Sequence, residues 1–491
     1  MKIAIVSPEA VPFAKTGGLA DVAGALPAEL SEMGHEVRLI IPKYKSVVEK
    51  GFELKRVNGE LSIPLGERTE KGGVLETAHN GVKVLLIEND WFFLRDELYR
   101  DAKTGADYLD NASRFVFFSR SVLEALKLTD FKPDIIHVND WQTALIPLYL
   151  KSLYRDDAYF NKTSSVLTIH NLGYQGLFWH HDMPLVGVGW EHFTPEGIEF
   201  YDKINFLKAG IVFADVINTV SERYAEEIQT ADDGFGLDGI LRKREKDLFG
   251  IVNGIDTEEW NPETDKLIAK NYSAKDTSGK AENKKVLLNE FYLPEKMDTP
   301  LIGIISRLAE QKGFDILAES MQELMSMELM MVILGTGEKK FHELLTTLGK
   351  KYPTKLGVKL AYDNRLAHLI EAGSDMFLMP SRYEPCGLNQ MMSMRYGTVP
   401  VVRATGGLDD TIIEFNEKDG KGNGVKFADY DAPSLTAAVK RGLSLFGKGN
   451  LWGKMVKNGM AADFSWRASA KKYEKLYMRA IKKTSLADSA V

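Results

Sequence analysis

Several short segments of the chain combine glycine with a charged side chain directly after an apolar run. The first, KTGGLADV, begins at Lys15 and follows the apolar run Ile3–Ser7, which predicts a β-strand. Gly17 and Gly18 allow the backbone to turn and to approach a ligand closely. The free N–H groups at the start of the following helix attract anions, and Lys15 adds a mobile positive charge. The segment predicts an anchor for a phosphorylated small molecule, with an ordinary turn as the alternative.

A second segment, ISRLAEQKG, follows the predicted strand Leu301–Ile305 and contains two cations. Arg307 offers a planar fork of donors and Lys312 offers a point charge, and together they suit a diphosphate. Ligands of doubly wound sheets bind beyond the carboxyl ends of the strands, where both residues are expected. The segment therefore predicts a diphosphate site, and a loop of solvated basic side chains is the alternative.

A carboxylate stands in the third segment, PSRYEPCGLNQ, again between a predicted strand and a predicted helix. Glu384 has the chemistry to orient sugar hydroxyls or to attack an anomeric carbon, and capping of the helix is the structural alternative. The helix beginning near Leu388 directs its N–H groups toward the same place. Cys386 is interpreted as a buried residue rather than a reactive thiol.

The fourth segment, RATGGLDD, repeats the order of strand, threonine, two glycines and helix. Thr405, Gly406 and Gly407 are predicted to donate hydrogen bonds to phosphate oxygens. Asp409 and Asp410 fit the first turn of a helix, where acidic residues are favourable, and are interpreted as structural.

Two histidines end neighbouring predicted strands in the first half of the chain. His137 opens HVNDW, and His170 lies in TIHNLGYQG. Histidines at such positions orient substrates or act as acids and bases, while a structural role is the alternative. Asp140 and Asn171 beside them favour a functional role as much as a structural one.

No segment has the ligand spacing that would predict a metal site. The adjacent His180, His181 and Asp182 are interpreted as a surface loop. In the segment DYD, Asp431 is interpreted as the N-cap of the helix after Pro433. We therefore expect neither a metal ion nor another cofactor.

Composition narrows the class of protein. The chain has 491 residues, a formal net charge of −7 and 44% hydrophobic residues, which indicate a multidomain globular protein and no general nucleic-acid binding. Cys386 is the single cysteine, so an internal disulfide is impossible and a reducing compartment is expected. No apolar run approaches the ~20 residues of a membrane span. A cytoplasmic protein without membrane association is the expectation.

Apolar runs alternate with helical patterns along the whole chain, which predicts parallel sheets covered by helices on both faces. Predicted strands are Ile3–Ser7, Glu36–Ile40, Val82–Ile87, Asp134–Val138, Ser165–Ile169, Val216–Thr219, Leu301–Ile305, Met330–Leu334, Val358–Ala361, Met376–Met379 and Val399–Val402. Predicted helices are Leu19–Met33, Ala112–Leu126, Trp141–Tyr154, Lys203–Phe213, Ser221–Gln229, Phe314–Leu324, Glu338–Leu348, Arg365–Ala372, Leu388–Tyr396 and Leu408–Glu414.

The alternation pauses between Asn253 and about Pro300, in a turn-rich and then charged stretch that predicts a domain boundary. Two doubly wound domains with a cleft between them are expected. A last helix over Ser469–Lys483 is amphipathic and is interpreted as packing on its own protein, with a membrane-surface helix as the alternative.

The order and wording of the motifs resemble one family, the bacterial glycogen synthases and plant starch synthases. The matching segments are KTGGLADV, HVNDW, TIHNLGYQG, GIVNGID, ISRLAEQKG, PSRYEPCGL, ATGGLDDT and FSWRASAKKY, and they span nearly the whole chain. The resemblance implies the α/β GT-B fold with two Rossmann-like domains around a cleft. It implies domains at 1–252 and 253–466, and a helix at 467–491 that crosses back to the first domain.

The same resemblance implies a retaining glucosyltransferase that moves glucose from ADP-glucose, or less often UDP-glucose, to the nonreducing 4-hydroxyl of an α-1,4-glucan. Front-face attack, in which the leaving phosphate oxygen takes the acceptor proton, is favoured over double displacement through Glu384. The expected partners are the nucleotide sugar and the glucan, and the oligomeric state is left open.

The resemblance also implies roles for single residues. Glu384 and His170 address the glucose, while Arg307 and Lys312 hold the departing diphosphate. Asp140 and Tyr99 lie on the acceptor side, and Tyr362 stacks on the nucleotide base. The implied donor-binding residues are Lys15, Gly17, Gly18, Asn253, Tyr362, Cys386, Gly387, Leu388, Thr405, Gly406 and Gly407.

Three positions depart from the family pattern. Many bacterial members have histidine where this chain has Asn139, which leaves the detail of acceptor binding open. Asn389 stands where threonine is common. Met392 occupies the place of a second glutamate found in other retaining GT-B enzymes, so Glu384 acts without that partner.

Other functions remain as alternatives. A UDP-glucose enzyme is distinguished by donor preference, and a catalytically silent glucan-binding protein by binding without turnover. No sequence context suggests the cofactor lysine of a glucan phosphorylase. A nicotinamide dehydrogenase is disfavoured because GxGxxG does not follow the first strand.

Overall fold

The computed structural model describes residues 1–488 and divides by its internal contacts into two compact units. Unit 1 comprises Met1–Val220, Ala225–Ile251 and the chain from Trp466, and unit 2 comprises Ser221–Tyr224 and Val252–Ser465. The short segment Ser221–Tyr224, which the predicted division assigned to the first domain, thus groups with the second unit. Within residues 1–488, no helix has both the length and the apolar character of a membrane-spanning segment.

A mixed sheet is built into unit 1. Its strands are β1 (Lys2–Val6), β2 (Glu36–Pro42), β3 (Lys55–Arg56), β4 (Leu61–Leu65), β5 (Arg68–His79), β6 (Val82–Glu88), β7 (Ile135–Asn139), β8 (Ser164–Ile169), β12 (Val216–Thr219) and β13 (Leu248–Gly250). Their order is β13-β12-β8-β7-β1-β2-β6-β5-β3, with β4 paired to β5. The strands from β13 to β6 in this order run parallel, and β5 runs antiparallel to β6, β3 and β4.

The parallel strands of unit 1 confirm the strands predicted for the first half of the chain. Every residue of β7 and β8 is buried, as expected where helices cover both faces of a sheet. The antiparallel strands β3, β4 and β5 were not predicted. The sequence of β5, RTEKGGVLETAH, is polar and interrupted by glycines, so it lacks the apolar run that marks a buried strand.

The helices of unit 1 cover this sheet. They are α1 (Gly18–Glu32), α2 (Lys45–Glu49), α3 (Asp90–Phe93), α4 (Asn111–Leu128), α5 (Leu145–Lys151), α6 (Met183–Val186), α7 (Phe206–Phe213), α9 (Asp238–Lys243) and α18 (Trp466–Asp488). The short α8 (Glu222–Glu227) begins in the segment that groups with unit 2. Tyr473, Leu476 and Tyr477 of α18 are buried in the same core as Ile3 and Val166, which confirms that this amphipathic helix packs on its own protein.

One predicted helix of unit 1 is wrong at its start. The pattern from Lys203 to Phe213 predicts a continuous helix, but residues Lys203–Asn205 form β11, which pairs with β10 (Glu199–Phe200) and β9 (Leu177–Trp179) in a small antiparallel sheet. The helix α7 begins only at Phe206, because the side chain of Asn205 caps it by accepting the N–H of Lys208 at 2.9 Å.

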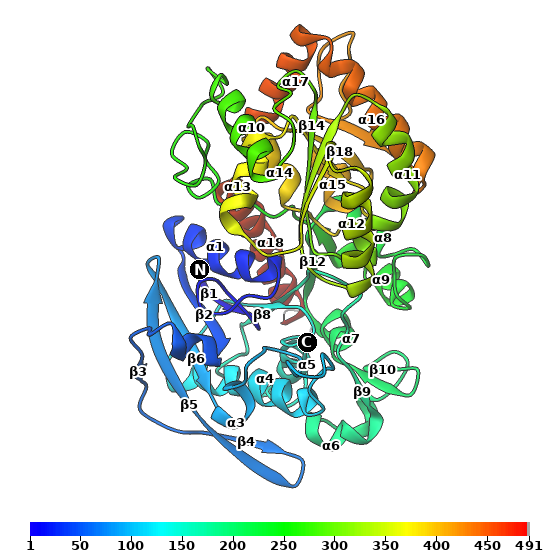
Figure 1. The fold of residues 1–491 in the computed structure, drawn as a ribbon. Helices are drawn as coiled ribbons and strands as arrows, with labels where there is room; N and C mark the ends of the chain where they lie inside the picture. The colour runs from blue at the N-terminus through cyan, green and yellow to red at the C-terminus, as the bar shows by residue number, and fades with distance from the viewer. Residues whose placement is uncertain (489–491) are drawn as a thin grey trace. The chain divides into compact units, whose positions relative to one another are not determined.

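Unit 2 contains a parallel sheet in the order β16-β15-β14-β17-β18-β19. Its strands are β14 (Leu301–Ile305), β15 (Met330–Leu334), β16 (Leu356–Lys359), β17 (Met376–Met379), β18 (Val399–Arg403) and β19 (Val425–Phe427). Its helices are α10 (Gly279–Glu290), α11 (Phe314–Ser326), α12 (Lys339–Lys351), α13 (Asn364–Gly373), α14 (Asn389–Arg395), α15 (Gly406–Thr411), α16 (Ala432–Phe446) and α17 (Gly449–Met460). Figure 1 shows β14 and β18 between α10, α13 and α14 on one side and α11 and α16 on the other.

Two features of unit 2 test finer expectations. The helix α10 lies within the stretch predicted as a boundary, and it was missed because its sequence, GKAENKKVLLNE, has no apolar stripe and buries polar residues such as Asn283 and Lys284. The expected cap at Asp431 is confirmed, since its carboxylate accepts the N–H of Ser434 at 2.7 Å at the start of α16.

Candidate active site

The strand order of unit 2 reverses between β14 and β17, so the loops that follow these two strands lie side by side at the carboxyl edge of the sheet. Such a switch point is where open α/β sheets bind ligands. The loop after β14 carries Arg307 and Lys312, and the loop after β17 carries Glu384. The topology therefore places the segment that carries Arg307 and Lys312 beside the segment that carries Glu384, two segments that are far apart in the sequence.

Lys312 and Glu384 form an ion pair with a distance of 2.6 Å between Nζ and Oε2. The same carboxylate oxygen accepts the hydroxyl hydrogen of Ser381 at 3.0 Å. Both charged side chains are largely shielded from water, with 18% of the Lys312 side chain and 7% of the Glu384 side chain exposed. In this environment the two charges interact more strongly than they would on the surface.

Arg307 is exposed, and no described residue accepts a hydrogen bond from its guanidinium. An unpaired guanidinium at a switch point keeps its fork of donors available for an anionic ligand. Lys312 provides a second positive charge within the same loop, although Glu384 already neutralises part of it.

Hydrogen bonds to backbone carbonyls join the two loops. The side chain of Gln311 donates to the Tyr383 carbonyl at 3.1 Å, and the N–H of Arg382 donates to the Gln311 carbonyl at 2.8 Å. Gly313 follows in the left-handed conformation with φ of 74°, and a Cβ at this position would lie 1.9 Å from the Pro380 carbonyl oxygen. Only glycine permits this close approach, which places Lys312 against the Glu384 loop.

We expect Gly313→Ala to destabilise unit 2 by about 1–3 kcal/mol and to lower kcat, because the new methyl group forces the two loops apart. Gly349→Ala is the matched control, since its Cβ would meet only Val358, at 3.5 Å. Urea unfolding and initial rates measure both effects. Equal unfolding free energies and equal kcat values in the two variants would contradict the assigned role of Gly313.

The loop before α14 buries Cys386 and leaves the other two predicted donor-binding residues, Gly387 and Leu388, half-buried. Burial raises the pKa of the Cys386 thiol to about 12, against a smaller lowering by the backbone N–H of Asn253. Cys386 is therefore an inert buried thiol, as interpreted from the sequence. The side-chain oxygen of Asn253 is buried without a hydrogen-bond partner. Gly387 has φ of 69°, and Leu388 is the half-buried N-cap of α14.

Two glycines at the start of α15 pack against the Glu384 loop. A Cβ on Gly406 would lie 2.0 Å from the Glu384 carbonyl oxygen, and a Cβ on Gly407 would lie 2.1 Å from the Cys386 carbonyl oxygen. The N–H of Gly407 donates to the Glu384 carbonyl at 3.1 Å, and the N–H of Thr405 donates to the Arg403 carbonyl at 3.0 Å. The backbone N–H groups of Thr405 and Gly407 are thus bonded within the protein in this structure. The predicted donation from Thr405, Gly406 and Gly407 to phosphate oxygens stays a prediction.

Tyr362 and Asn389 are two further positions of unit 2 that the sequence analysis singled out. Tyr362 follows β16 and is 82% exposed, so one face of its ring is open to a ligand. Asn389, one of the departures from the family pattern, donates its amide to the Ile305 carbonyl at 3.0 Å and so fastens α14 to the end of β14.

The strand order of unit 1 reverses between β1 and β7, and the KTGG segment follows β1. Lys15 is half-exposed and pairs with Asp21 at 2.7 Å. Gly17 is the N-cap of α1, and Gly18 is its first residue, with no side chain capping the N–H groups there.

Glu9 holds this segment in place and was not predicted as a site residue. Its buried carboxylate accepts the Thr16 N–H at 2.8 Å and the Thr16 hydroxyl at 2.5 Å. Burial raises the pKa of Glu9, and these hydrogen bonds, with one from the Gly17 N–H, oppose the rise. A carboxylate between the first strand and a glycine turn was the signal available in the sequence.

His170 lies at the end of β8 in a network with two residues that follow β7. The backbone N–H of His170 donates to the Asp140 carboxylate at 2.7 Å, and the ring Nε2 lies 2.9 Å from the side-chain oxygen of Asn139. The Asn139 amide donates to the Val6 carbonyl at 3.0 Å, so its oxygen accepts from His170 and the hydrogen resides on Nε2. Asn139, a departure from the family pattern, thus sets the tautomer of His170 and leaves Nδ1 as an acceptor.

Burial controls the charges in this network. It lowers the pKa of His170 to about 3, with a smaller contribution from His137, so the imidazole is neutral at pH 7. It raises the pKa of Asp140 to about 7, and hydrogen bonds from the backbone of His170 and Asn171 oppose the rise. Asp140 also has a left-handed backbone with φ of 56°, which is unusual outside glycine and is typical of functional sites.

We expect Asp140→Asn to change how stability depends on pH. The folded-state pKa lies above the unfolded value, so wild-type stability falls as pH rises from ~4 to about 7, where the folded protein retains the proton. Asparagine cannot ionise but keeps the acceptor for His170. The free energy of unfolding of the variant, measured with urea, should therefore rise relative to that of the wild type by up to about 1.4 kcal/mol per pH unit in this range. If the difference in unfolding free energy between the two proteins stayed constant across this pH range, Asp140 would have the same pKa in the folded and the unfolded protein.

The two predicted histidines, His137 and His170, have different surroundings in the structure. His137 is fully buried within β7, where Nδ1 lies 2.9 Å from the Tyr477 hydroxyl and Nε2 lies 2.7 Å from the Thr168 hydroxyl. Burial lowers its pKa to about 3. His137 is therefore a structural residue that fastens α18 to the sheet, whereas His170 lies half-buried at the strand end.

Tyr99 contacts Phe115 with 6.0 Å between ring centroids, and its hydroxyl is buried without a partner. His180, His181 and Asp182 form a single turn of 3-10 helix rather than a loop. The described residues include no group of three or more His, Cys, Asp or Glu side chains arranged to hold a metal ion.

Comparisons with known proteins identify the family of this chain. Residues 2–243 match the family described as "Starch synthase catalytic domain", and residues 288–458 match "Glycosyl transferases group 1". A glycogen synthase from Thermosipho africanus is 49% identical and covers 98% of this chain and 100% of its own length. The chain belongs to the glycogen synthase family. The resemblance drawn from the motifs is thereby confirmed, and the chain is a glycosyltransferase.

Further members of the glycogen synthase family and solved structures extend the comparison. A glycogen synthase from Koribacter versatilis is 47% identical, with 98% of each chain covered. The catalytic domain of starch synthase IV from Arabidopsis thaliana, solved with ADP and acarbose, has a TM-score of 0.88 and 32% identity over 98% of this chain and 99% of its own. Sucrose-phosphate synthase from Thermosynechococcus elongatus shares the fold, with a TM-score of 0.60 and 17% identity. The predicted GT-B fold is confirmed.

Proposed function

We propose that this member of the glycogen synthase family transfers glucose from ADP-glucose to the nonreducing 4-hydroxyl of an α-1,4-glucan, with retention of configuration. The observation that carries the proposal is the cluster of Arg307, Lys312 and Glu384 at the switch point of unit 2. ADP in the Arabidopsis starch synthase IV structure supports adenosine diphosphate as the leaving group.

The charges of Arg307, Lys312 and Glu384 suit the charges that develop during glucosyl transfer. Cleavage of the bond between glucose and phosphate develops negative charge on the diphosphate and positive charge on the sugar. Arg307 and Lys312 stabilise the diphosphate, and the Glu384 carboxylate stabilises the sugar cation or orients its hydroxyls. Because two cations are available for the leaving group, we propose that the reaction proceeds without a metal ion, which addition of a chelator to the assay tests.

The environment of Glu384 favours front-face attack over double displacement. Its Oε2 atom already accepts from Lys312 and Ser381, and such contacts reduce the nucleophilicity of a carboxylate. In front-face attack the leaving phosphate oxygen takes the proton of the acceptor hydroxyl. Double displacement would instead leave glucose esterified to Glu384, which mass spectrometry would detect as one added glucosyl unit.

Unit 1 supplies the residues proposed for the acceptor and for the phosphates. The neutral His170, oriented by Asn139, is a hydrogen-bond partner for a sugar hydroxyl rather than a charge. Lys15 and the uncapped N–H groups at the start of α1 suit an anion. Asp140 and Tyr99 are proposed on the acceptor side.

Initial rates of glucose transfer to glycogen test the proposal, with ADP-glucose and UDP-glucose compared side by side and no metal added. Faster transfer from ADP-glucose is expected. A clear preference for UDP-glucose would replace the donor and keep the mechanism. Glucan binding without transfer from either donor would overturn the proposal in favour of a binding protein.

A further inference from the structure

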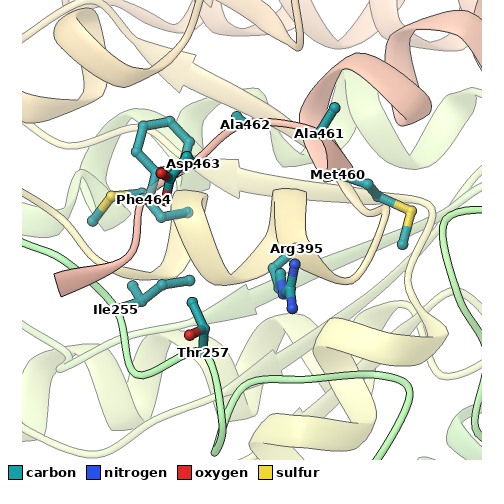
Figure 2. Close-up of a pocket in the computed structure, with 9 residues that line it drawn as sticks. Ile255, Thr257, Arg395, Met460, Ala461, Ala462, Asp463 and Phe464 are labelled. Atoms are coloured by element: carbon teal, nitrogen blue, oxygen red, sulfur yellow. The ribbon is translucent and has the colours of Figure 1, made fainter. Parts of the chain in front are cut away.

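A cavity of about 210 Å³ lies in unit 2 and shares no residue with the candidate active site. Its walls come from α14, from the loop after Asn253, and from the end of α17 with the segment that follows it. The lining residues are Ile255, Thr257, Met391, Arg395, Met460, Ala461, Ala462, Asp463 and Phe464. Figure 2 shows Arg395 between the loop that carries Ile255 and Thr257 and the segment from Met460 to Phe464.

The guanidinium of Arg395 has no acceptor in this cavity. Its Nε atom is buried without a hydrogen-bond partner, and no described residue forms an ion pair with the side chain. A buried N–H group without an acceptor is unfavourable, because the group loses its water and gains nothing in return. A bound ligand that brings an oxygen atom would satisfy it.

The remaining lining residues define the chemistry of that ligand. Ile255, Met391, Met460 and Phe464 present apolar surface, so the body of the ligand is apolar. The Asp463 carboxylate accepts the N–H of Ser465 at 3.0 Å and adds a negative charge beside the cavity. A ligand with two negative charges is disfavoured there, whereas a single carboxylate matches the fork of one guanidinium.

We propose that this cavity binds a small monocarboxylate with a short apolar chain, held by Arg395. The carboxylate accepts from the guanidinium, and the chain contacts the two methionines and Phe464. This site is independent of the proposed glucosyl transfer, so its test does not depend on activity.

The position of the cavity gives binding a structural consequence. The chain enters the long stretch of unit 2 at Val252 and leaves it after Ser465, and both ends of that stretch line the cavity. The two ends are joined where the Ile255 N–H donates to the Phe464 carbonyl at 2.9 Å. A bound carboxylate therefore adds contacts to both ends of this stretch and should slow hydrogen exchange of their amides.

Calorimetric titration of the full chain with butyrate tests the site. We expect saturable binding with a Kd of about 1 mM, weaker binding of acetate, and no binding of 1-butanol, which keeps the chain but lacks the carboxylate. Arg395→Gln should weaken butyrate binding at least about tenfold. Ala462→Phe, which fills the cavity and leaves the guanidinium intact, should do the same.

Lys350→Gln, at an exposed cation of α12, is the matched control and should bind butyrate as the wild type does. Hydrogen exchange of residues 253–258 and 459–465 should slow with butyrate in the wild type and not in Arg395→Gln. Absence of saturable butyrate binding, equal binding by Arg395→Gln, or binding of inorganic phosphate in place of butyrate would each overturn the proposal.

Discussion

Replacement of Arg307 by alanine should lower kcat about 10²–10³-fold and leave the stability of the protein within about 0.5 kcal/mol of the wild type. The guanidinium is exposed and no described residue accepts from it, so its removal breaks no hydrogen bond or ion pair among the described residues. Its proposed partner is the diphosphate of the donor, whose negative charge grows as the bond to glucose breaks. The loss should therefore fall on kcat more than on KM.

Arg155→Ala is the matched control, because Arg155 is also exposed and its side chain forms no ion pair within the described residues. That variant should retain wild-type rates. Arg307→Lys separates charge from geometry, since lysine keeps the positive charge but loses the planar fork. Partial activity in Arg307→Lys is expected. A kcat of Arg307→Ala equal to that of the wild type would remove Arg307 from the site.

The sequence predicted most of the buried parallel strands because each is a short apolar run. The same reasoning missed β5, whose polar, glycine-containing sequence forms an edge region with little burial. It also placed Lys203 in a helix, because the apolar pattern of α7 does not reveal that Asn205 caps it. Local caps and edge pairing depend on contacts that apolar periodicity does not encode.

The candidate site was predictable as a set of residues but not as a geometry. One motif identified Arg307 and Lys312 and another identified Glu384, and only the order of β14 and β17 brings their loops side by side. The contacts of Glu9 and Asn139 were not predicted, because they depend on which backbone atoms the buried oxygen or amide reaches, although the position of Glu9 before a glycine turn was a signal in the sequence. The glycine pairs were predicted as phosphate donors, and the close packing of Gly407 against the Glu384 loop is a second reason for glycine that the sequence does not reveal.

Neutralisation of Glu384 should have the largest effect on activity. Glu384→Gln keeps the shape of the side chain and an acceptor for Ser381, and removes the negative charge that faces Lys312. We expect kcat to fall about 10³-fold. Lys312→Met should lower kcat to a similar extent, because it removes charge from the diphosphate site and leaves Glu384 buried without its cation.

Stability distinguishes a catalytic role of this pair from a merely structural one. Each single variant leaves one shielded charge without its partner and should lose about 1–3 kcal/mol in urea unfolding, while the double variant loses both charges. The double variant should therefore be no less stable than either single variant, since the two effects are not additive for residues in contact. Its activity should nevertheless stay as low as that of the single variants. Recovery of kcat together with stability in the double variant would show that the ion pair only supports the fold. Persistent loss of kcat in a stable protein would show that the individual charges at Lys312 and Glu384 act on the substrate.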